Sequence, residues 1–124
     1  MAKHHITNSD KSFGEMPANL IVITEAGRCI LGHCQVIIGG SKTIGNFLHD
    51  WIQRRTDTPE LDLTEYSFDH VNSVINFFYT HDLIVEHSCY TSDLDRLVQK
   101  FDCPVLTRRF RTIKMMYRVV FLEC

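Results

Sequence analysis

Four residues in this sequence could together supply the ligands of a structural zinc ion. Cys29, His33 and Cys34 lie close together, and Cys103 follows much later in the chain. Thiolate and imidazole groups are the usual ligands of structural zinc, so these four could complete a tetrahedral site. The spacing offers one C-x4-C pair and no second close pair, which is a weak zinc signal. We therefore expect buried thiols that pack as small hydrophobic groups, with no metal and no cofactor.

His33 and Cys34 also have the types of side chain that form a base and a nucleophile. Adjacent side chains on a turn usually point apart, and no orienting Asp or Asn lies near them in the sequence. Residues 39–43 (GGSKT) lack the adjacent Gly-Lys of a phosphate loop, so they are better explained as a helix end followed by a helix cap. The G-x-G-x-x-G, H-E-x-x-H and G-x-S-x-G patterns do not occur. We predict that the protein is not an enzyme.

A group of apolar residues with charged neighbours has the composition of a binding surface. One interpretation is a helix face buried in the protein's own core, because apolar periodicity first reports burial. The other is a partner-binding patch, because Trp and Arg are enriched among the residues that dominate binding energy. The candidate partner-binding residues are Leu48, Asp50, Trp51, Ile52 and Arg54.

Charge is divided unevenly along the chain. Residues 1–107 carry 8 Lys and Arg against 14 Asp and Glu, whereas residues 108–124 carry 5 against 1. Phe110 and Tyr117 lie among the cations of this basic tail, as in a surface that stacks on nucleic-acid bases. The acidic body lacks the broad positive potential of nucleic-acid binders, so nucleic acid is an unlikely partner. We expect instead a helix that packs on the domain.

The length and composition of the chain restrict its class. At 124 residues, a single domain is expected. A hydrophobic fraction of 44% with 23% charged residues excludes a disordered, collagen-like or coiled-coil chain. No stretch reaches the roughly 18 apolar residues of a membrane span, and the N-terminus lacks the apolar segment of a secretory signal. Five cysteines without an export signal indicate reduced thiols, hence a cytoplasmic or nuclear protein.

The N-terminal half predicts short elements. Residues 1–17 are mostly polar and predict a flexible arm. Residues 20–24 and 28–31 flank a Gly-containing turn and predict a hairpin, whose apolar faces should both be covered. Residues 35–38 predict a short helix that ends at Gly39 and Gly40.

Ser41 is a suitable N-cap for a second helix that includes Trp51. Residues 60–64 (ELDLT) alternate and predict a short strand. The spacing i, i+3, i+4, i+7 then occurs twice, which predicts two amphipathic helices with these apolar positions: Val71, Val74, Ile75 and Phe78, then Leu94, Leu97, Val98 and Phe101. The first should lie near the centre of the core. Residues 82–85 predict a short extended piece, and residues 117–124 are compatible with helix or strand. This order favours an α+β class, a helical cluster capped by a small mixed sheet.

Three segments carry a resemblance to a known family. Residues 30–41 (ILGHCQVIIGGS), 71–80 (VNSVINFFYT) and 94–106 (LDRLVQKFDCPVL) resemble the BTB/POZ domain, over roughly residues 19–107. In that family a strand leads into an Ala-His-Lys/Arg-x-Val-Leu turn, and a later helix ends in Phe-x-Tyr-Thr-Gly. His33 falls on the family histidine and Tyr79-Thr80 on its Tyr-Thr, which implies the POZ fold. Residues 41–50 (SKTIGNFLHD) are also similar to a helix of elongin C and of the F-box-binding cullin adaptor.

The chain departs from the BTB pattern at several positions. Asn19 and Cys34 stand where BTB homodimers carry an acidic and a basic residue, and with His33 they are the candidate dimer-pocket residues. Losing both charges avoids burying one alone. The hydrophobic-x-Glu motif of cullin-binding members falls on residues 52–54, where Arg replaces the acid, while residues 48–50 hold the only nearby hydrophobic-x-acid triplet. His81 stands where the family has Gly, at a turn that favours positive φ.

The resemblance implies a protein–protein interaction module, with residues 1–17 as an arm, 18–107 as the BTB/POZ domain and 108–124 as a basic tail. By this likeness it is an adaptor or subunit of a cullin-RING E3 ubiquitin ligase. The alternative is a regulatory oligomerisation partner of other BTB proteins, such as transcription regulators, without a ligase role. Homodimers, heterodimers with BTB proteins and a cullin are the partners implied, and no membrane is expected.

Overall fold

The predicted hairpin forms the middle of a four-stranded mixed sheet in the computed structural model, which describes residues 6–85 and 92–123. Strands β2 (Leu20–Ile23) and β3 (Arg28–Gly32) pair antiparallel, with Val22 opposite Ile30. β1 (Ile6–Asp10) runs parallel to β3, and β4 (Glu60–Asp62) runs parallel to β2, so the strand order is β1-β3-β2-β4. The short turn between β2 and β3 is the 3₁₀ helix η1 (Glu25–Gly27).

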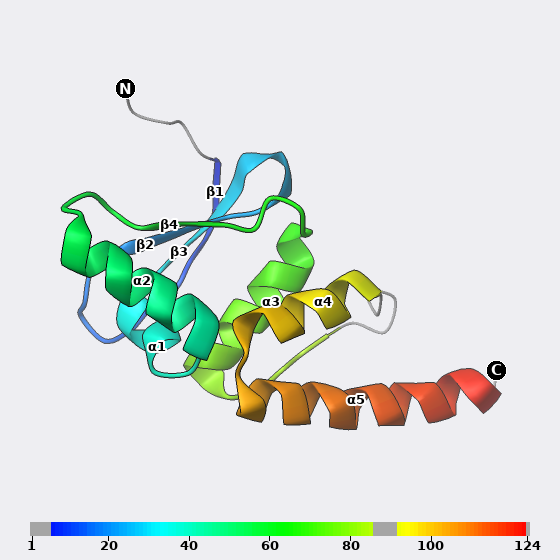
Figure 1. Ribbon diagram of the computed structural model, residues 1–124. Helices are drawn as coiled ribbons and strands as arrows, with labels where there is room; N and C mark the ends of the chain where they lie inside the picture. The colour runs from blue at the N-terminus through cyan, green and yellow to red at the C-terminus, as the bar shows by residue number, and fades with distance from the viewer. Residues whose placement is uncertain (1–5, 86–91, 124) are drawn as a thin grey trace.

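In the described part of the chain, five α-helices follow the hairpin and gather below the sheet in Figure 1. They are α1 (Cys34–Ile38), α2 (Lys42–Arg54), α3 (Phe68–Thr80), α4 (Ser92–Phe101) and α5 (Pro104–Glu123). The protein is therefore an α+β domain, as predicted. No helix in the part of the chain that the structure describes is both long enough and apolar enough to cross a membrane.

Helix α3 lies at the centre of the core, as its periodicity predicts. Val71 and Val74 are wholly buried, Ile75 is 1% exposed and Phe78 is 9% exposed. The predicted apolar positions of α4 are buried in the same cluster. Burying such a stripe supplies the main free energy that holds a helix of 10 to 13 residues in place, because isolated helices of this length are marginal.

The helix starts follow the predicted capping chemistry. The Ser41 hydroxyl accepts a hydrogen bond from the Ile44 amide at 3.2 Å and so caps α2. Ser67 caps α3 in the same way through the His70 amide, also at 3.2 Å. Helix α3 ends at His81, which has φ 65° and ψ 11°, the left-handed conformation expected where the BTB pattern has glycine.

Of the two glycines that follow α1, only Gly40 is required for a steric reason. Gly39 has φ −67°, so the left-handed region is not what requires a glycine there. At Gly40, a Cβ would lie 2.7 Å from the ring of Phe78 on α3, closer than real side chains approach. The α1–α2 connection can pass over α3 only because this position has no side chain.

Two predicted segments differ from the structure. Within the expected flexible arm, residues 6–10 form β1, and the Lys11 amide donates to the Leu31 carbonyl at 2.9 Å. The apolar alternation that marks a strand is missing there, but backbone groups pair with a free sheet edge whatever their side chains are. Residues 1–5 lie outside the described residues.

The basic tail was predicted to begin at residue 108, but this residue lies inside α5, which begins at Pro104. Leu106 and Phe110, on either side of residue 108, are both buried, so this part of the helix packs on the domain. The same helix continues to Glu123, so the strand alternative is wrong for the described part of 117–124. Residues 82–85, predicted as a short extended piece, belong to no helix and to no strand of the sheet.

The two faces of the sheet are covered unequally. Leu20, Val22 and Ile30 face the core and are at most 1% exposed. Ile21 and Leu31, which are partners across the β2–β3 ladder, are only half-buried. The expectation that both apolar faces are fully covered therefore holds for one face, and the helices supply that cover.

Candidate functional site

The two segments that carry the strongest resemblance meet at His33 and Tyr79. His33 lies between β3 and α1, and Tyr79 lies in the last turn of α3. The Tyr79 hydroxyl accepts a hydrogen bond from the His33 amide at 2.8 Å and lies 2.8 Å from Nδ1 of the ring. Nε2 of His33 lies 3.0 Å from the Met16 carbonyl.

These contacts determine the tautomer of His33. The Met16 carbonyl can only accept, so the proton of the neutral imidazole is on Nε2, which donates it to that carbonyl. Nδ1 then accepts from the Tyr79 hydroxyl, whose oxygen accepts from the His33 amide. Burial also raises the pKa of the Tyr79 hydroxyl. His33 is thus a satisfied interior histidine that ties the N-terminal segment and α3 to the start of α1.

Asn19 and Cys34, the other two dimer-pocket candidates, are brought together beside His33. The Asn19 side-chain oxygen accepts from the Cys34 amide at 2.8 Å, which supplies the cap that the His33 side chain does not give to α1. The Cys34 thiol donates to the Asn19 carbonyl at 3.5 Å. Burial raises the pKa of that thiol, which disfavours the thiolate that a nucleophile needs.

The cysteines of the weak zinc signal do not form a ligand set. The Cys29 thiol donates to the Gly27 carbonyl at 3.4 Å, and Cys29, Cys34 and Cys103 are free and buried. Across residues 6–85 and 92–123, no three His, Cys, Asp or Glu side chains lie close enough together to hold a metal ion.

The candidate partner-binding residues on α2 separate into a buried one and exposed ones. Leu48 is wholly buried in the core, so its assignment as a partner contact is corrected. Phe47 is 46% exposed and Ile52 is 48% exposed, and the half-buried Trp51 lies between them with its ring 5.9 Å from that of Phe47. We call this group the α2 surface: Phe47, Asp50, Trp51, Ile52 and Arg54.

Charged side chains fix the orientation of the α2 surface. Arg54 pairs with Asp50 at 2.9 Å along the helix, and Trp51 donates from its indole nitrogen to the Asp57 carbonyl at 3.2 Å. The guanidinium of Arg55 lies 3.7 Å from the centre of the Trp51 ring and pairs with the Asp57 carboxylate at 2.7 Å. Hydrogen bonding from Arg55 holds the pKa of Asp57 below its usual value. Asp57 could not be predicted from the sequence as part of this group, but Arg55 follows Trp51 at the i+4 spacing that brings helical side chains together.

A groove joins the α2 surface to the dimer-pocket candidates. It is lined by Asn19, Cys34, Gln35 and Ile38 on one side and by Ile52 and residues 55–59 on the other. A single partner lying along this groove would contact Asn19, Cys34 and Ile52, which come from different parts of the sequence.

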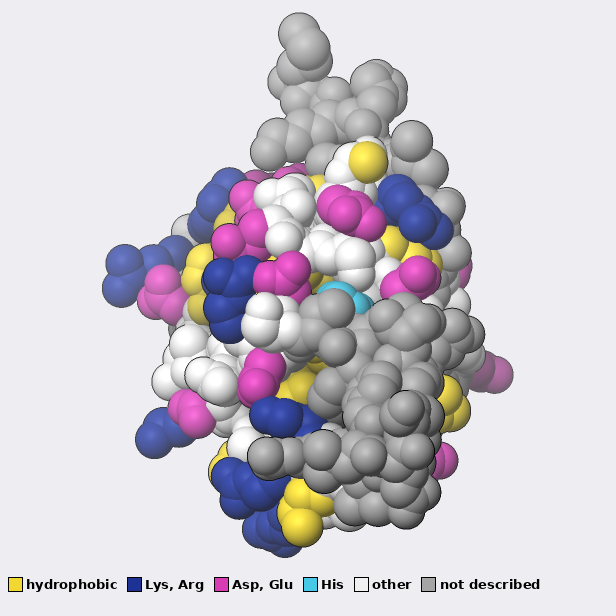
Figure 2. Space-filling model, turned by 90° about the vertical axis from the view of Figure 1, so that its right-hand side faces the viewer, with side chains coloured by type: hydrophobic (Ala, Val, Ile, Leu, Met, Phe, Trp, Pro, Cys, Tyr) yellow, Lys and Arg dark blue, Asp and Glu magenta, His cyan; other side chains and the backbone are white. Residues whose placement is uncertain are grey.

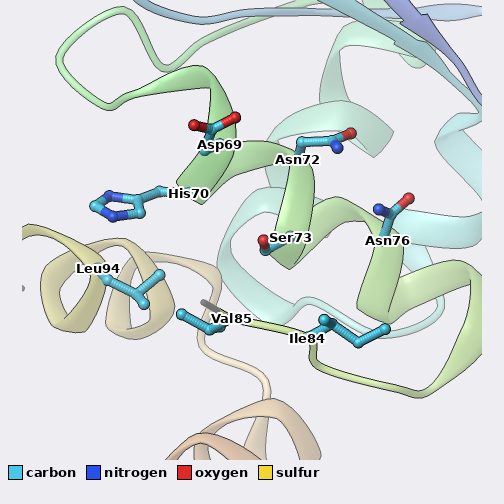
Figure 3. A pocket seen from close by; sticks show the side chains of 8 residues that line it. All are labelled: Asp69, His70, Asn72, Ser73, Asn76, Ile84, Val85 and Leu94. Atoms are coloured by element: carbon cyan, nitrogen blue, oxygen red, sulfur yellow. The ribbon is translucent and has the colours of Figure 1, made fainter. Parts of the chain in front are cut away.

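A second, more polar pocket lies along α3 (Figure 3). The side chains of Asp69, His70, Asn72, Ser73 and Asn76 form one wall, and Ile84, Val85 and Leu94 form the other. In Figure 3, Asn72 and Asn76 extend from the same side of α3, whereas His70 extends toward Leu94. Lys11 donates to the Asn72 side-chain oxygen at 2.6 Å, and burial lowers the Lys11 pKa. In sequence these residues are simply the polar side of an amphipathic helix, so the pattern could not reveal the pocket.

A scan of the chain against models of protein families gave no match, and a search of curated proteins also gave none. The function is therefore argued from the residues and their geometry.

Proposed function

We propose that this chain is a protein–protein interaction module of BTB/POZ type that acts as an adaptor or subunit of a cullin-RING E3 ubiquitin ligase. The observation that carries the proposal is the contact between its two motif segments. His33 and Tyr79 share two hydrogen bonds, and Gly40 lies against the Phe78 ring. The left-handed His81 adds support, since the resemblance requires a glycine-like conformation at that turn.

The proposed mechanism is non-covalent. One surface holds a cullin or a second BTB domain, another holds a client, and proximity raises the effective concentration of the groups that react on the partner. No catalytic step is assigned to the chain itself. The cysteines that the structure describes, Cys29, Cys34 and Cys103, are free and buried, which supports a reducing compartment, hence the cytoplasm or the nucleus.

The α2 surface is the proposed cullin contact. Exposed Phe47 and Ile52 flank an indole that Arg55 and Asp57 already hold in place. A partner that covers this group gains apolar burial without paying to order the Trp51 side chain. Trp and Arg are also the residue types that most often dominate interface energy.

The geometry changes how a cullin would use this helix. Leu48-His49-Asp50 is a hydrophobic-x-acid triplet in sequence, but Leu48 is buried and cannot present its side chain. Ile52 is exposed and stands at the hydrophobic position of the family motif. Arg54, which pairs with Asp50, stands at the position of the acid. The proposed contact therefore centres on Ile52, with a cullin surface that accepts a cation there.

Binding of the purified chain to a panel of purified cullin N-terminal domains tests the proposal, with biolayer interferometry as the readout. We expect one cullin to bind, and Ile52→Asp to weaken that binding by about tenfold or more, as a central contact would. Ile84→Asp is the matched control, because Ile84 is 77% exposed outside the α2 surface. Absence of cullin binding, or equal loss in both variants, would contradict the adaptor proposal.

The second candidate function, a regulatory partner of other BTB proteins, is favoured by the Asn19–Cys34 pair. These residues bond to each other and bury no lone charge. The pocket therefore needs no charged residue of a second identical chain to pair with it, so a different BTB protein can occupy that place. A pull-down that recovers BTB proteins and no cullin would support this function over the adaptor.

A further inference from the structure

The outward side of α5 carries an unusual mixture of side chains. At 100° per residue, six residues share an arc of about 120° along roughly 16 Å of helix. We call this the α5 face: Val105, Arg108, Arg109, Thr112, Met115 and Met116. Leu106 and Phe110 point the other way into the core, and Ile113 packs against the same cluster.

Apolar groups mark both ends of the α5 face. Val105 is 59% exposed at one end, and Met115 and Met116 are 64% and 63% exposed at the other. Since α5 already buries Leu106 and Phe110, these three residues are not needed to hold the helix on the domain. A helix that only faced water would carry polar side chains at such positions.

The arginines on and beside the α5 face make no ion pair with a described residue, whereas five other surface cations do. The ion pairs formed elsewhere on the surface are Arg54–Asp50, Arg55–Asp57, Arg96–Asp93, Lys100–Glu65 and Lys114–Asp95. Arg108, Arg109 and Arg111 are exposed and make no ion pair with any residue that the structure describes. Figure 2 shows Lys and Arg side chains gathered with hydrophobic ones at the lower end of the molecule, the height at which α5 lies in Figure 1.

We propose that the α5 face binds an acidic amphipathic helix of a partner protein. Its carboxylates would pair with Arg108 and Arg109, because the guanidinium fork matches carboxylate geometry in two-point hydrogen bonds. Its apolar side chains would cover Val105 at one end and the two methionines at the other, where the flexible thioether adapts to the shape presented. The spacing of these groups along three turns matches the length of a short helix.

Charge complementarity favours a short acidic segment over an extended polyanion. The body of the chain carries 14 acidic against 8 basic residues. A nucleic acid or an anionic membrane extends beyond α5 and would be repelled by that body, whereas a short helix contacts α5 alone. This inference concerns a surface separate from the α2 surface and does not rest on the BTB/POZ proposal.

Fluorescence polarisation with a labelled synthetic peptide tests it. The peptide probe carries Glu on its middle turn and Leu on both outer turns, and a matched probe carries Gln in place of Glu. We expect the Glu peptide to bind at micromolar concentration, and the Gln peptide at least tenfold more weakly. The double variant Arg108→Glu/Arg109→Glu should weaken binding of the Glu peptide at least tenfold, while Arg54→Glu/Arg55→Glu, with the same change in net charge, should not.

A second variant separates the mixed surface from simple attraction of charge. Met115→Ser/Met116→Ser leaves the charge unchanged, and we expect severalfold weaker peptide binding with an unaltered circular dichroism spectrum. The proposal is overturned if the Glu peptide fails to bind at about 100 µM, which would place its dissociation constant above the micromolar range. It is also overturned if the α5 and α2 charge variants lose peptide binding equally. Tighter binding to phosphatidylserine vesicles or to a single-stranded oligonucleotide than to the peptide would also overturn it.

Discussion

The Tyr79 hydroxyl links two parts of the chain that are 46 residues apart, because it bonds to both the backbone and the ring of His33. The resemblance to the BTB pattern singles out His33 and Tyr79 as motif residues. The bond itself could not, since one sequence gives no side-chain direction. The lack of a nearby orienting Asp or Asn in the sequence speaks against His33 as a catalytic base, and the structure places it at 1% exposure with both ring nitrogens bonded.

Removing that hydroxyl should destabilise the domain. For Tyr79→Phe we expect a loss of about 1–3 kcal/mol in the free energy of unfolding, because the buried His33 amide loses its acceptor and Nδ1 loses its donor. Urea denaturation followed by tryptophan fluorescence measures it. Tyr66→Phe is the control, since the Tyr66 hydroxyl has no bond to a described residue, and a change of equal size there would contradict the role of Tyr79.

The left-handed residue at the end of α3 predicts a stabilising substitution. His81 has φ 65°, a conformation that costs a residue with a side chain more than it costs glycine. We expect His81→Gly to raise the free energy of unfolding by about 0.5–1 kcal/mol and His81→Ala to give no gain. Thermal unfolding followed by circular dichroism would show it. A lower melting temperature for His81→Gly would mean that the imidazole, 6.4 Å from the Phe77 ring, stabilises this turn more than the backbone strains it.

At the scale of elements, periodicity and capping predicted most of the helices. The positions of Val71, Val74 and Ile75 indicated a buried stripe, and Ser41 indicated a helix start. Strand β1 was missed because its pairing uses backbone groups, which leave no trace in side-chain type. The burial of Leu48 beside exposed Phe47 and Ile52 could not be predicted either, because those apolar residues span more of the helix circumference than one core face covers.

The glycine pair gives a matched test of how α1 and α3 approach. Gly40→Ala should cost about 1–3 kcal/mol of stability, because its Cβ would lie 2.7 Å from a Phe78 ring that is itself packed 5.3 Å from the Phe101 ring. Gly39→Ala should be nearly neutral, because its Cβ meets the Gln35 carbonyl at 3.4 Å, an ordinary contact, and its φ is helical. Chemical denaturation of both variants decides between them. Equal effects would contradict the close packing of residues 30–41 on residues 71–80.

The same hydroxyl that caps α2 also ties this helix to α4. Ser41 accepts from the Ile44 amide and donates to the Phe101 carbonyl. We expect Ser41→Ala to lower the free energy of unfolding by about 1–3 kcal/mol, since it removes a cap and leaves a buried carbonyl unpaired. Ser41→Thr, which keeps the hydroxyl, should recover part of that loss in the same denaturation experiment. An alanine variant as stable as the natural chain would show that neither bond contributes.

At the scale of the whole molecule, the chain presents two outward surfaces with exposed apolar side chains, the α2 surface and the α5 face. Its α+β class, helical cluster and mixed sheet could be predicted from the order of elements. Which residues form the α2 surface and the α5 face could not be predicted. Exposed apolar residues and unpaired arginines become evident only when it is known which side chains the core buries. The α2 surface and the α5 face lie on different helices, so one molecule could hold two partners, as an adaptor must.

The most direct measurement of that central claim is quantitative affinity purification of the tagged chain from cells, with protein partners identified by mass spectrometry. We expect a cullin to be enriched with the natural chain, retained with Ile84→Asp and lost with Ile52→Asp. Recovery of no cullin, or equal recovery of the cullin with both variants, would show that the chain is not a cullin adaptor.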